Sequence, residues 1–393
     1  MDPSTTKQLE KEVTEAIERG DTAAALERVK KCLSDVENTP LNVAITGESG
    51  SGKSTFINAL RGLGDEDEGS AQTGVVETTM EPTPYPHPKI KSVTYWDLPG
   101  TGTPNFKASE YLNKVQLKRY DFFIIIASER FKENHILLAR EIQKMNKKFY
   151  FVRSKIDRDL RDSQERRPKT FNEKELLDKI RQDCVNSLKV NLNNIKSDSV
   201  FLVSSFQPEK FDFSRLLKTF EDELPSHKRY VFLLALPNIS SQAIQMKKQG
   251  LESAIPWVTA QAAVVSIVPG LSNLNEILSL SYHIRGYVEC FGLDKKSLNN
   301  LEERSGRSDL KHLMKSTFVI NEITSDLLNG ELKKRTGAVY MGVKSFFSWV
   351  PVLSAAVSAP LSAGACYDLL YYALDEIAED AKVALEAAFG CSE

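Results

Sequence analysis

The stretch that decides the fold is a glycine-rich loop, Gly47-Glu48-Ser49-Gly50-Ser51-Gly52-Lys53-Ser54. It follows an apolar run at residues 41–45 and continues into a helical pattern that starts at Thr55. A strand and a helix joined in this way form a P-loop, whose glycines let backbone N–H groups turn toward phosphate oxygens. Lys53 would reach the β and γ phosphates, and the Ser54 hydroxyl would be a ligand for Mg²⁺. We therefore predict a nucleotide site at residues 47–55.

A second element, Asp97-Leu98-Pro99-Gly100, follows the apolar run at residues 93–96. In α/β proteins, ligand sites form at the carboxyl ends of parallel strands, which is where Asp97 would lie. Its carboxylate would face the same metal as Ser54, and Gly100 would contact the γ phosphate. The order of the two motifs along the chain is that of GTPases.

A third element, Ser154-Lys155-Ile156-Asp157, selects the base. It resembles the Asn/Thr-Lys-x-Asp element of GTPases, in which Asp157 would accept hydrogen bonds from guanine N1 and N2 while the Lys155 stem packs on the ring. Adenine lacks that pair of donors. Ser154 departs from the usual Asn or Thr, whereas Ser204 and Ser205, after the next apolar run, supply the element that meets guanine O6. We therefore predict that the cofactors are GTP/GDP and Mg²⁺.

The segment between the P-loop and Asp97 is expected to hold the first switch, Thr73-Gly74-Val75-Val76-Glu77-Thr78-Thr79-Met80. Three threonines in it, Thr73, Thr78 and Thr79, are candidate ligands for Mg²⁺. We favour Thr79, although spacing alone leaves the choice open.

One residue type is missing after Gly100. GTPases of the Ras type place a water-orienting Gln there, whereas this chain has Thr101, which cannot replace an amide. Intrinsic hydrolysis should therefore be slow, or a group from elsewhere should complete the site. A second protomer is the economical source of that group.

Periodicity predicts the architecture around these motifs. Apolar runs of strand length at 41–45, 93–96, 122–126, 149–152 and 200–203 alternate with helical stretches. This alternation is typical of an α/β fold with a doubly wound, mostly parallel sheet. Residues 5–37 have helical spacing with a break at Gly20-Asp21, and no strand pattern returns after Leu224. We predict N-terminal helices at 1–38 that pack with the helical domain, a Ras-like G domain at 39–224 and an all-α domain at 225–393.

Composition excludes several other classes. The 393 residues include 51 Lys+Arg and 53 Asp+Glu, a net charge of -2, so the chain lacks the basic field that favours nucleic-acid partners. Its five Cys are scattered, without metal-ligand spacing, and we expect them to be free thiols in a reducing compartment. The first residues do not read as a signal peptide, which favours a cytoplasmic protein.

Longer phrases resemble the immunity-related (interferon-inducible) GTPases. They are Gly47-Glu48-Ser49-Gly50 through Gly62, Thr73-Gly74-Val75-Val76-Glu77, Trp96-Asp97-Leu98-Pro99-Gly100, Tyr120-Asp121-Phe122-Phe123, Phe149-Tyr150-Phe151-Val152-Arg153, Leu224-Pro225-Ser226-His227-Lys228-Arg229 and Phe291-Gly292-Leu293-Asp294. Lys53 places the chain in the GKS branch. The resemblance implies a dynamin-like large GTPase that dimerises through its nucleotide faces and oligomerises with GTP bound. It also implies association with vacuoles that enclose intracellular pathogens.

The resemblance also assigns catalytic roles. By position, the family's switch glutamate falls on Glu77, and its basic residues at the catalytic interface fall on Arg130 and Lys132. Spacing alone would favour a solvated charged loop for the two basic residues. With Lys53, Glu77 and Arg130 complete the predicted catalytic set.

Two apolar stretches bear on membranes. Residues 255–271 are interrupted by prolines and polar side chains, which favours a buried helix. Residues 345–367 are uncharged, but Pro351 and Pro360 favour a buried or hairpin element over a true span. Asp2, where myristoylation would need Gly, indicates no lipid anchor. We expect a cytoplasmic protein that associates reversibly, if at all, with endomembranes or pathogen-containing vacuoles.

Two functions share the predicted pocket. One is a self-assembling enzyme that hydrolyses GTP; the alternative is a septin-like GTP-binding scaffold with little turnover. A P-loop kinase or ATPase is disfavoured by Asp157. Turnover measured against protein concentration distinguishes the first two.

Overall fold

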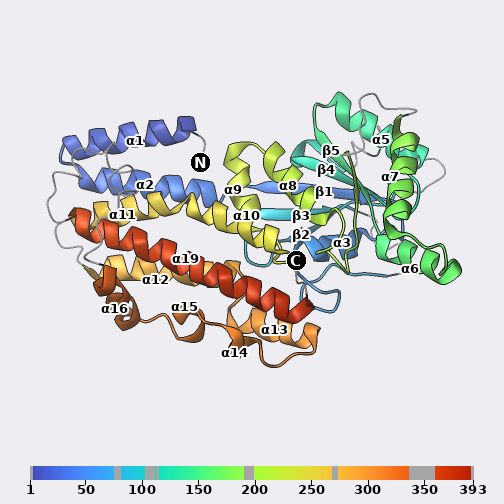
Figure 1. The fold of residues 1–393 in the computed structure, drawn as a ribbon. Coiled ribbons are helices and arrows are strands. Elements are labelled where there is room, and N and C mark those ends of the chain that lie inside the picture. Colours follow the sequence, from blue (N-terminus) through green and yellow to red (C-terminus); the bar gives the residue numbers. More distant parts are fainter. Residues whose placement is uncertain are drawn as a thin grey trace. The chain divides into compact units, whose positions relative to one another are not determined.

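The computed structural model describes residues 3–74, 81–101, 111, 115–189, 199–267, 273–335 and 359–390 (Figure 1). The chain divides into two units. The sheet unit comprises Pro40–Leu224 and Ala235–Ile239, and the helical unit comprises Met1–Thr39, Pro225–Leu234 and Ser240–Glu393. The segment 235–239 thus groups with the sheet unit, whereas the sequence pattern assigned it to the helical domain.

Six strands form the sheet in the order β2-β3-β1-β4-β5-β6. Their bounds are β1 (Leu41–Gly47), β2 (Thr83–Pro86), β3 (Val93–Asp97), β4 (Phe122–Ala127), β5 (Lys148–Arg153) and β6 (Val200–Leu202). All neighbours are parallel except β2, which pairs antiparallel with β3. The five strands predicted from apolar runs are confirmed. The proline-rich β2 was not predicted, and its edge position is the place in a sheet where proline is tolerated.

Helices cover both faces of the sheet. They are α3 (Lys53–Leu60), α5 (Glu133–Lys144), α6 (Ile156–Arg166), α7 (Glu173–Lys189) and α8 (Phe213–Glu223). On one face, Phe123 and Phe151 belong to a core shared with α5, α6 and α7. On the other face, Phe122 packs against Phe220 of α8, with 4.8 Å between ring centroids. Successive side chains of a strand point to opposite faces of the sheet, so Phe122 and Phe123 of β4 pack into opposite layers. The doubly wound α/β fold is confirmed.

The sheet changes its winding direction at β1. After β1 the chain adds β3 on one side and then β4 on the other. Such a reversal leaves a crevice at the carboxyl end of the strand, where α/β folds bind ligands. The P-loop begins at this end.

The described part of the helical unit contains helices and no strand. They are α1 (Pro3–Glu18), α2 (Thr22–Glu37), α9 (Ser226–Leu234), α10 (Ser241–Glu252), α11 (Ile255–Ile267), α12 (Asn273–Cys290), α13 (Lys295–Ser305), α14 (Leu310–Leu313), α15 (Thr317–Ile320), α16 (Ser325–Arg335) and α19 (Ala359–Phe389). Asp21 caps α2 by accepting from the Ala24 N–H at 3.0 Å, and Trp257 of α11 joins the core between α1 and α2. In Figure 1, α19 runs beside α10, α11 and α12.

Residues 255–267 of the first apolar stretch form α11, in which Trp257 and Thr259 are buried, as predicted, and residues 268–271 lie outside the described residues. Residues 345–358 of the second stretch lie outside the described residues, and α19 includes the rest. No helix among the described residues combines the length and the apolar character that crossing a bilayer requires. Four cysteines, Cys32, Cys184, Cys290 and Cys366, are free thiols, and Cys391 lies outside the described residues.

Candidate nucleotide-binding site

The P-loop closes around the Lys53 side chain. Gly52 precedes α3 in the left-handed conformation, with φ of 87°, which turns the chain from the loop into the helix. Lys53 is buried, and its Nζ donates to the carbonyl oxygens of Glu48 at 3.0 Å and Gly47 at 3.5 Å. The ammonium therefore lies within the loop, where a phosphate ligand needs a positive charge.

A hydroxyl and a carboxylate meet beside this loop. The Ser54 hydroxyl donates to Asp97 Oδ2 at 3.0 Å, and Asp97 is 1% exposed at the end of β3. Both are hard oxygen ligands suited to Mg²⁺. Within the described ranges, no group of three or more His, Cys, Asp or Glu residues is arranged to hold a metal ion. A cation here would complete its shell with phosphate and water oxygens, as Mg²⁺ commonly does.

Thr101 faces the protein interior. It is fully buried, its N–H donates to the Gly47 carbonyl at 3.1 Å, and its own carbonyl accepts from Asn134 Nδ2 at 2.8 Å. Its Oγ1 has no hydrogen-bond partner among the described residues. The Thr101 side chain is therefore buried at the position that follows Gly100, where Ras-type GTPases place the water-orienting Gln.

The base-recognition loop, residues 154–157, lies against the P-loop. Lys155 adopts the left-handed conformation with φ of 59°, and its Nζ donates to the Gly50 carbonyl at 2.7 Å. The Ser154 hydroxyl donates to the Ser51 carbonyl at 2.7 Å. Serine at the first position therefore supplies the bridge to the P-loop that this loop needs. Asp157 follows, half-buried, in the first turn of α6.

The loop after β6 borders the same region. The N–H of Ile156 donates to the Val203 carbonyl at 3.3 Å, which joins the base-recognition loop to the end of β6. Ser204 is buried, and its hydroxyl accepts from the N–H groups of Phe206 and Gln207. The Ser204 side chain thus shapes its own turn, and Ser205 beside it is half-buried.

A basic loop, residues 128–132, adjoins the P-loop. Lys132 pairs with Glu48, with 2.7 Å between Nζ and Oε2, and the hydrogen bond to Glu48 raises the pKa of Lys132. Arg130 pairs with Asp183 at 3.1 Å while 79% of its side chain stays exposed. Burial lowers the pKa of His135 to about 4, so its neutral ring accepts a hydrogen bond from the Lys132 N–H through Nδ1. The buried His135 therefore holds the basic loop in place, while the side chains of Arg130 and Lys132 remain exposed.

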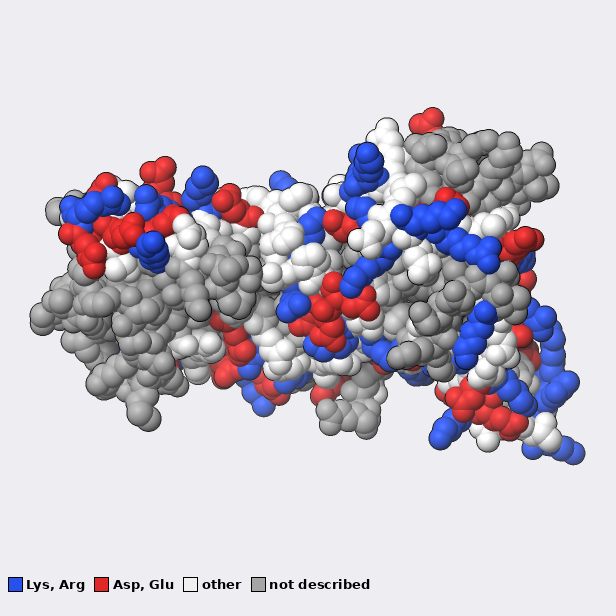
Figure 2. Space-filling view, turned by 90° about the horizontal axis from the view of Figure 1, so that it is seen from above, with Lys and Arg blue, Asp and Glu red and all other residues white. Residues whose placement is uncertain are grey.

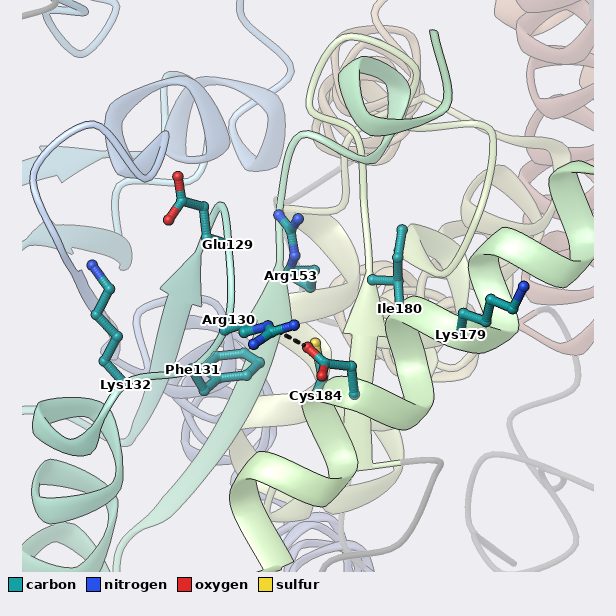
Figure 3. Close-up of a pocket in the computed structure, with 9 residues that line it drawn as sticks. Glu129, Arg130, Phe131, Lys132, Arg153, Lys179, Ile180 and Cys184 are labelled. Carbon is teal, nitrogen blue, oxygen red and sulfur yellow. Dashed lines mark ion pairs between the residues drawn. The ribbon is translucent and has the colours of Figure 1, made fainter. Parts of the chain in front are cut away.

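The basic loop also forms one wall of a pocket of about 800 Å³ (Figure 3). Lys179, Ile180 and Cys184 of α7 form the opposite wall, and Arg153 also lines the pocket. Acidic partners accompany the cations here, including Asp183 for Arg130 and Glu175 for Lys179. On the face seen in Figure 2, acidic and basic side chains are likewise interspersed, in keeping with the net charge of -2.

The structure places most of the predicted site residues around the carboxyl ends of β1, β3, β5 and β6. They are Gly47, Glu48, Ser49, Gly50, Ser51, Gly52, Lys53, Ser54, Thr55, Asp97, Gly100, Ser154, Lys155, Asp157, Ser204 and Ser205. Glu77 and Thr79 lie outside the described residues. Arg153 was not singled out from the sequence. Its signal was a basic residue at the end of a buried strand, directly before the base motif.

Comparisons with known proteins show which family and which proteins this chain is similar to. The sequence model of the family described as Interferon-inducible GTPase (IIGP) matches residues 6–388. The chain is 40% identical to Interferon-gamma-inducible GTPase 10 of Mus musculus, over 95% of this chain and 88% of that protein. It is 40% identical to Interferon-inducible GTPase 5 of Rattus norvegicus, over 93% and 80%. A crystal structure of Aquifex aeolicus Era bound to GDP.AlF4- aligns with a TM-score of 0.31 and 18% identity, over 56% of this chain and 66% of that chain.

Proposed function

The chain belongs to the interferon-inducible GTPase family and is a GTPase, and from that premise we propose that it hydrolyses GTP, with Mg²⁺ bound, as a dimer formed through its nucleotide face. The observation that carries the nucleotide site is the meeting of three motifs far apart in the sequence. Ser54 bonds to Asp97, and Lys155 bonds to the Gly50 carbonyl. Groups suited to a phosphate, a metal and a base therefore lie close together, which supports a single nucleotide site.

Each residue has a role that follows from its chemistry. Lys53 offsets the negative charge of the β and γ phosphates, and Ser54 and Asp97 would hold Mg²⁺, with Thr79 as a further ligand. When bound, Mg²⁺ supplies positive charge that stabilises the charge developing on the transferred phosphoryl group. Asp157 accepts from guanine N1 and N2, and the Lys155 stem packs on the ring.

Base selection is tested by Asp157→Asn. The variant should bind GTP about 30-fold more weakly, equal to about 2 kcal/mol, because the carboxylate that accepts two hydrogen bonds is lost. Xanthosine triphosphate should bind better, because the carboxamide donates to the xanthine 2-oxo group. Competition binding measures both constants. Asp178→Asn, at an exposed position on α7, is the matched control, and an unchanged preference for GTP in Asp157→Asn would remove the base assignment.

We place the missing catalytic group on a second protomer. Thr101 is buried against the P-loop and cannot orient water, while Arg130 and Lys132 stand on an exposed loop beside Glu48. These observations support catalysis across the nucleotide face, and the resemblance to the family supports Glu77 as the catalytic carboxylate. Oligomers formed with GTP bound would extend the same assembly.

Turnover per molecule should therefore rise with protein concentration. Glu77→Ala should lower the plateau rate about tenfold or more, equal to about 1.4 kcal/mol of transition-state stabilisation, and leave GTP affinity near that of the wild type. Arg130→Ala should shift the concentration dependence instead. Phosphate release measured from nanomolar to high micromolar protein checks both effects. A flat specific activity, with Glu77→Ala equal to wild type, would favour the septin-like scaffold.

We further propose that the protein acts in the cytoplasm, in cell-autonomous immunity, through reversible contact with endomembranes or pathogen-containing vacuoles. Family membership supports the immune role. The absence of a membrane-spanning helix among the described residues is compatible with reversible contact. Flotation with liposomes in the GDP and GTP states tests this membrane contact. The bound protein should be released from the liposomes without detergent, because the contact is reversible.

A further inference from the structure

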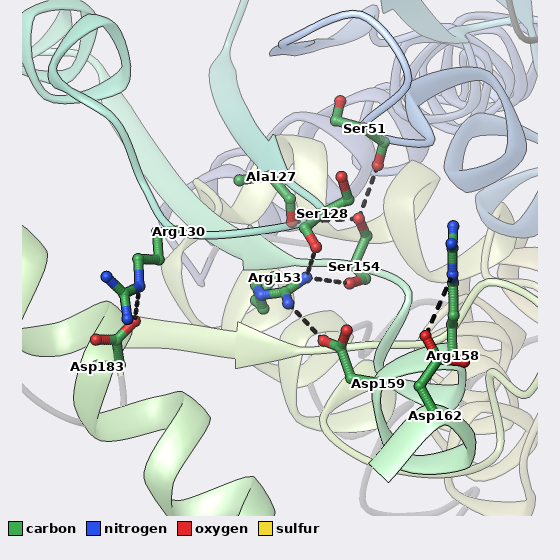
Figure 4. Close-up of polar contacts among 10 residues, drawn as sticks. All are labelled: Ser51, Ala127, Ser128, Arg130, Arg153, Ser154, Arg158, Asp159, Asp162 and Asp183. Carbon is green, nitrogen blue, oxygen red and sulfur yellow. Dashed lines mark hydrogen bonds and ion pairs between the residues drawn. The ribbon is translucent and has the colours of Figure 1, made fainter. Parts of the chain in front are cut away.

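Arg153 connects three segments around the base-recognition loop (Figure 4). It is the last residue of β5, and only 9% of its side chain is exposed. One terminal nitrogen donates to the Ser128 carbonyl and, at 2.8 Å, to the Ser154 carbonyl. The other pairs with Asp159 on α6. A single guanidinium therefore reaches the basic loop, the base-recognition loop and the helix that follows it.

This arrangement has an energetic reason. A buried charge is costly unless it is paired and hydrogen-bonded, and the planar fork of arginine can serve several acceptors at once. Asp159 is half-buried, and burial raises its pKa while Arg153 opposes the rise. Removing either partner leaves a poorly solvated charge, so the pair resists separation.

The two anchors bracket the residues that meet the base. Ser154 comes directly before Lys155, and Asp159 comes two residues after Asp157. Lys155 holds a positive φ of 59°, which costs a residue with a side chain on the order of 1 kcal/mol and persists only when its surroundings hold it. Arg153 binds the chain on both sides of Lys155, at the Ser154 carbonyl and at Asp159. Through Ser128 it also ties the turn to the end of β4, the strand beside β1.

We propose that Arg153 is a positioning residue for guanine specificity, holding Ser154 and Asp159 so that Asp157 faces the N1 and N2 donors of the base. This rests on the proposed role of Asp157. Arg153 acts here through Ser154 and Asp159, the residues to which its guanidinium is bonded. Its loss lets Lys155 relax and Asp157 drift, which weakens the hydrogen bonds to the base while the phosphate contacts of the P-loop remain.

The readout is the ratio of affinities for GDP and IDP. Inosine lacks the 2-amino group, so this ratio reports the hydrogen bond between N2 and Asp157. Calorimetry on the full chain should show wild-type protein preferring GDP by about tenfold or more. Arg153→Met, which keeps the stem and removes the charge, should lower the ratio at least fivefold. Asp159→Asn should lower it in the same direction, with the guanidinium still present.

The matched control lies one turn along the same helix. Arg158 and Asp162 form an exposed pair at 3.8 Å (Figure 4), so Asp162→Asn should leave the ratio at the wild-type value. Urea unfolding of each variant shows whether it is folded, and Asp159→Asn keeps the test valid if Arg153→Met unfolds. A loss of stability alone would weaken GDP and IDP equally and leave the ratio unchanged.

Two results would overturn the proposal, and they differ. If wild-type protein does not distinguish GDP from IDP, the base assignment of Asp157 fails and this inference fails with it. If wild-type protein distinguishes them and both variants at positions 153 and 159 keep the full ratio, only the role of Arg153 fails.

Discussion

Lys53→Ala should slow phosphate release from GTP by about 100- to 1000-fold. Removing one group that stabilises transition-state charge in a buried site costs about 2.7–4 kcal/mol. Lys53 is buried, and its ammonium already lies among the P-loop carbonyls, whereas Lys132 and Lys155 reach the P-loop from other segments and are held there by Glu48 and the Gly50 carbonyl. Binding of GTP should weaken more than binding of GDP, because the lost charge faces the γ phosphate.

The measurement is single-turnover phosphate release with protein in excess over GTP, at one fixed protein concentration high enough to bind all of the nucleotide. Lys144→Ala is a suitable control, because Lys144 pairs with Glu141 at the surface and is 70% exposed. It should retain the wild-type rate. Hydrolysis by Lys53→Ala at the wild-type rate would refute the assignment of the P-loop.

Gly47→Ala should destabilise the sheet unit by about 3 kcal/mol. Gly47 is the last residue of β1 and has φ of 154°. A Cβ at this position would lie 2.1 Å from the Ile126 carbonyl oxygen of the neighbouring strand β4. Backbone atoms of a central strand cannot move aside as a flexible side chain can, so the strands themselves would have to separate.

Gly69→Ala separates this clash from the cost of a positive φ. Gly69 has φ of 77° and no atom within 4 Å of an added Cβ, so the substitution should cost only about 1 kcal/mol. Urea unfolding without nucleotide measures both variants. Equal losses of stability in the two variants would show that the clash of the added Cβ with the Ile126 carbonyl does not contribute to the destabilisation.

Local patterns were sufficient for most of the fold and much of the candidate site. Strands and helices have their own periodicities, and a P-loop is a short, continuous stretch whose meaning depends on the strand before it and the helix after it. Residues 41–55 contain all of this information. The sequence pattern did not predict β2, because its prolines argue against a strand. Pairing with β3 is what makes this segment a strand.

What the sequence determined by itself was the P-loop, the order of the nucleotide motifs, the doubly wound sheet and the switch to helices after Leu224. Tertiary structure alone decided that Ser154 bridges to Ser51, that Thr101 turns inward, and that Arg153 spans from Ser128 to Asp159. The physical reason is the distance along the sequence between the residues that interact. Periodicity and motif spacing are properties of neighbouring residues, whereas these contacts join strand ends that lie far apart in the sequence and meet only because parallel strands place their carboxyl ends on one edge of the sheet.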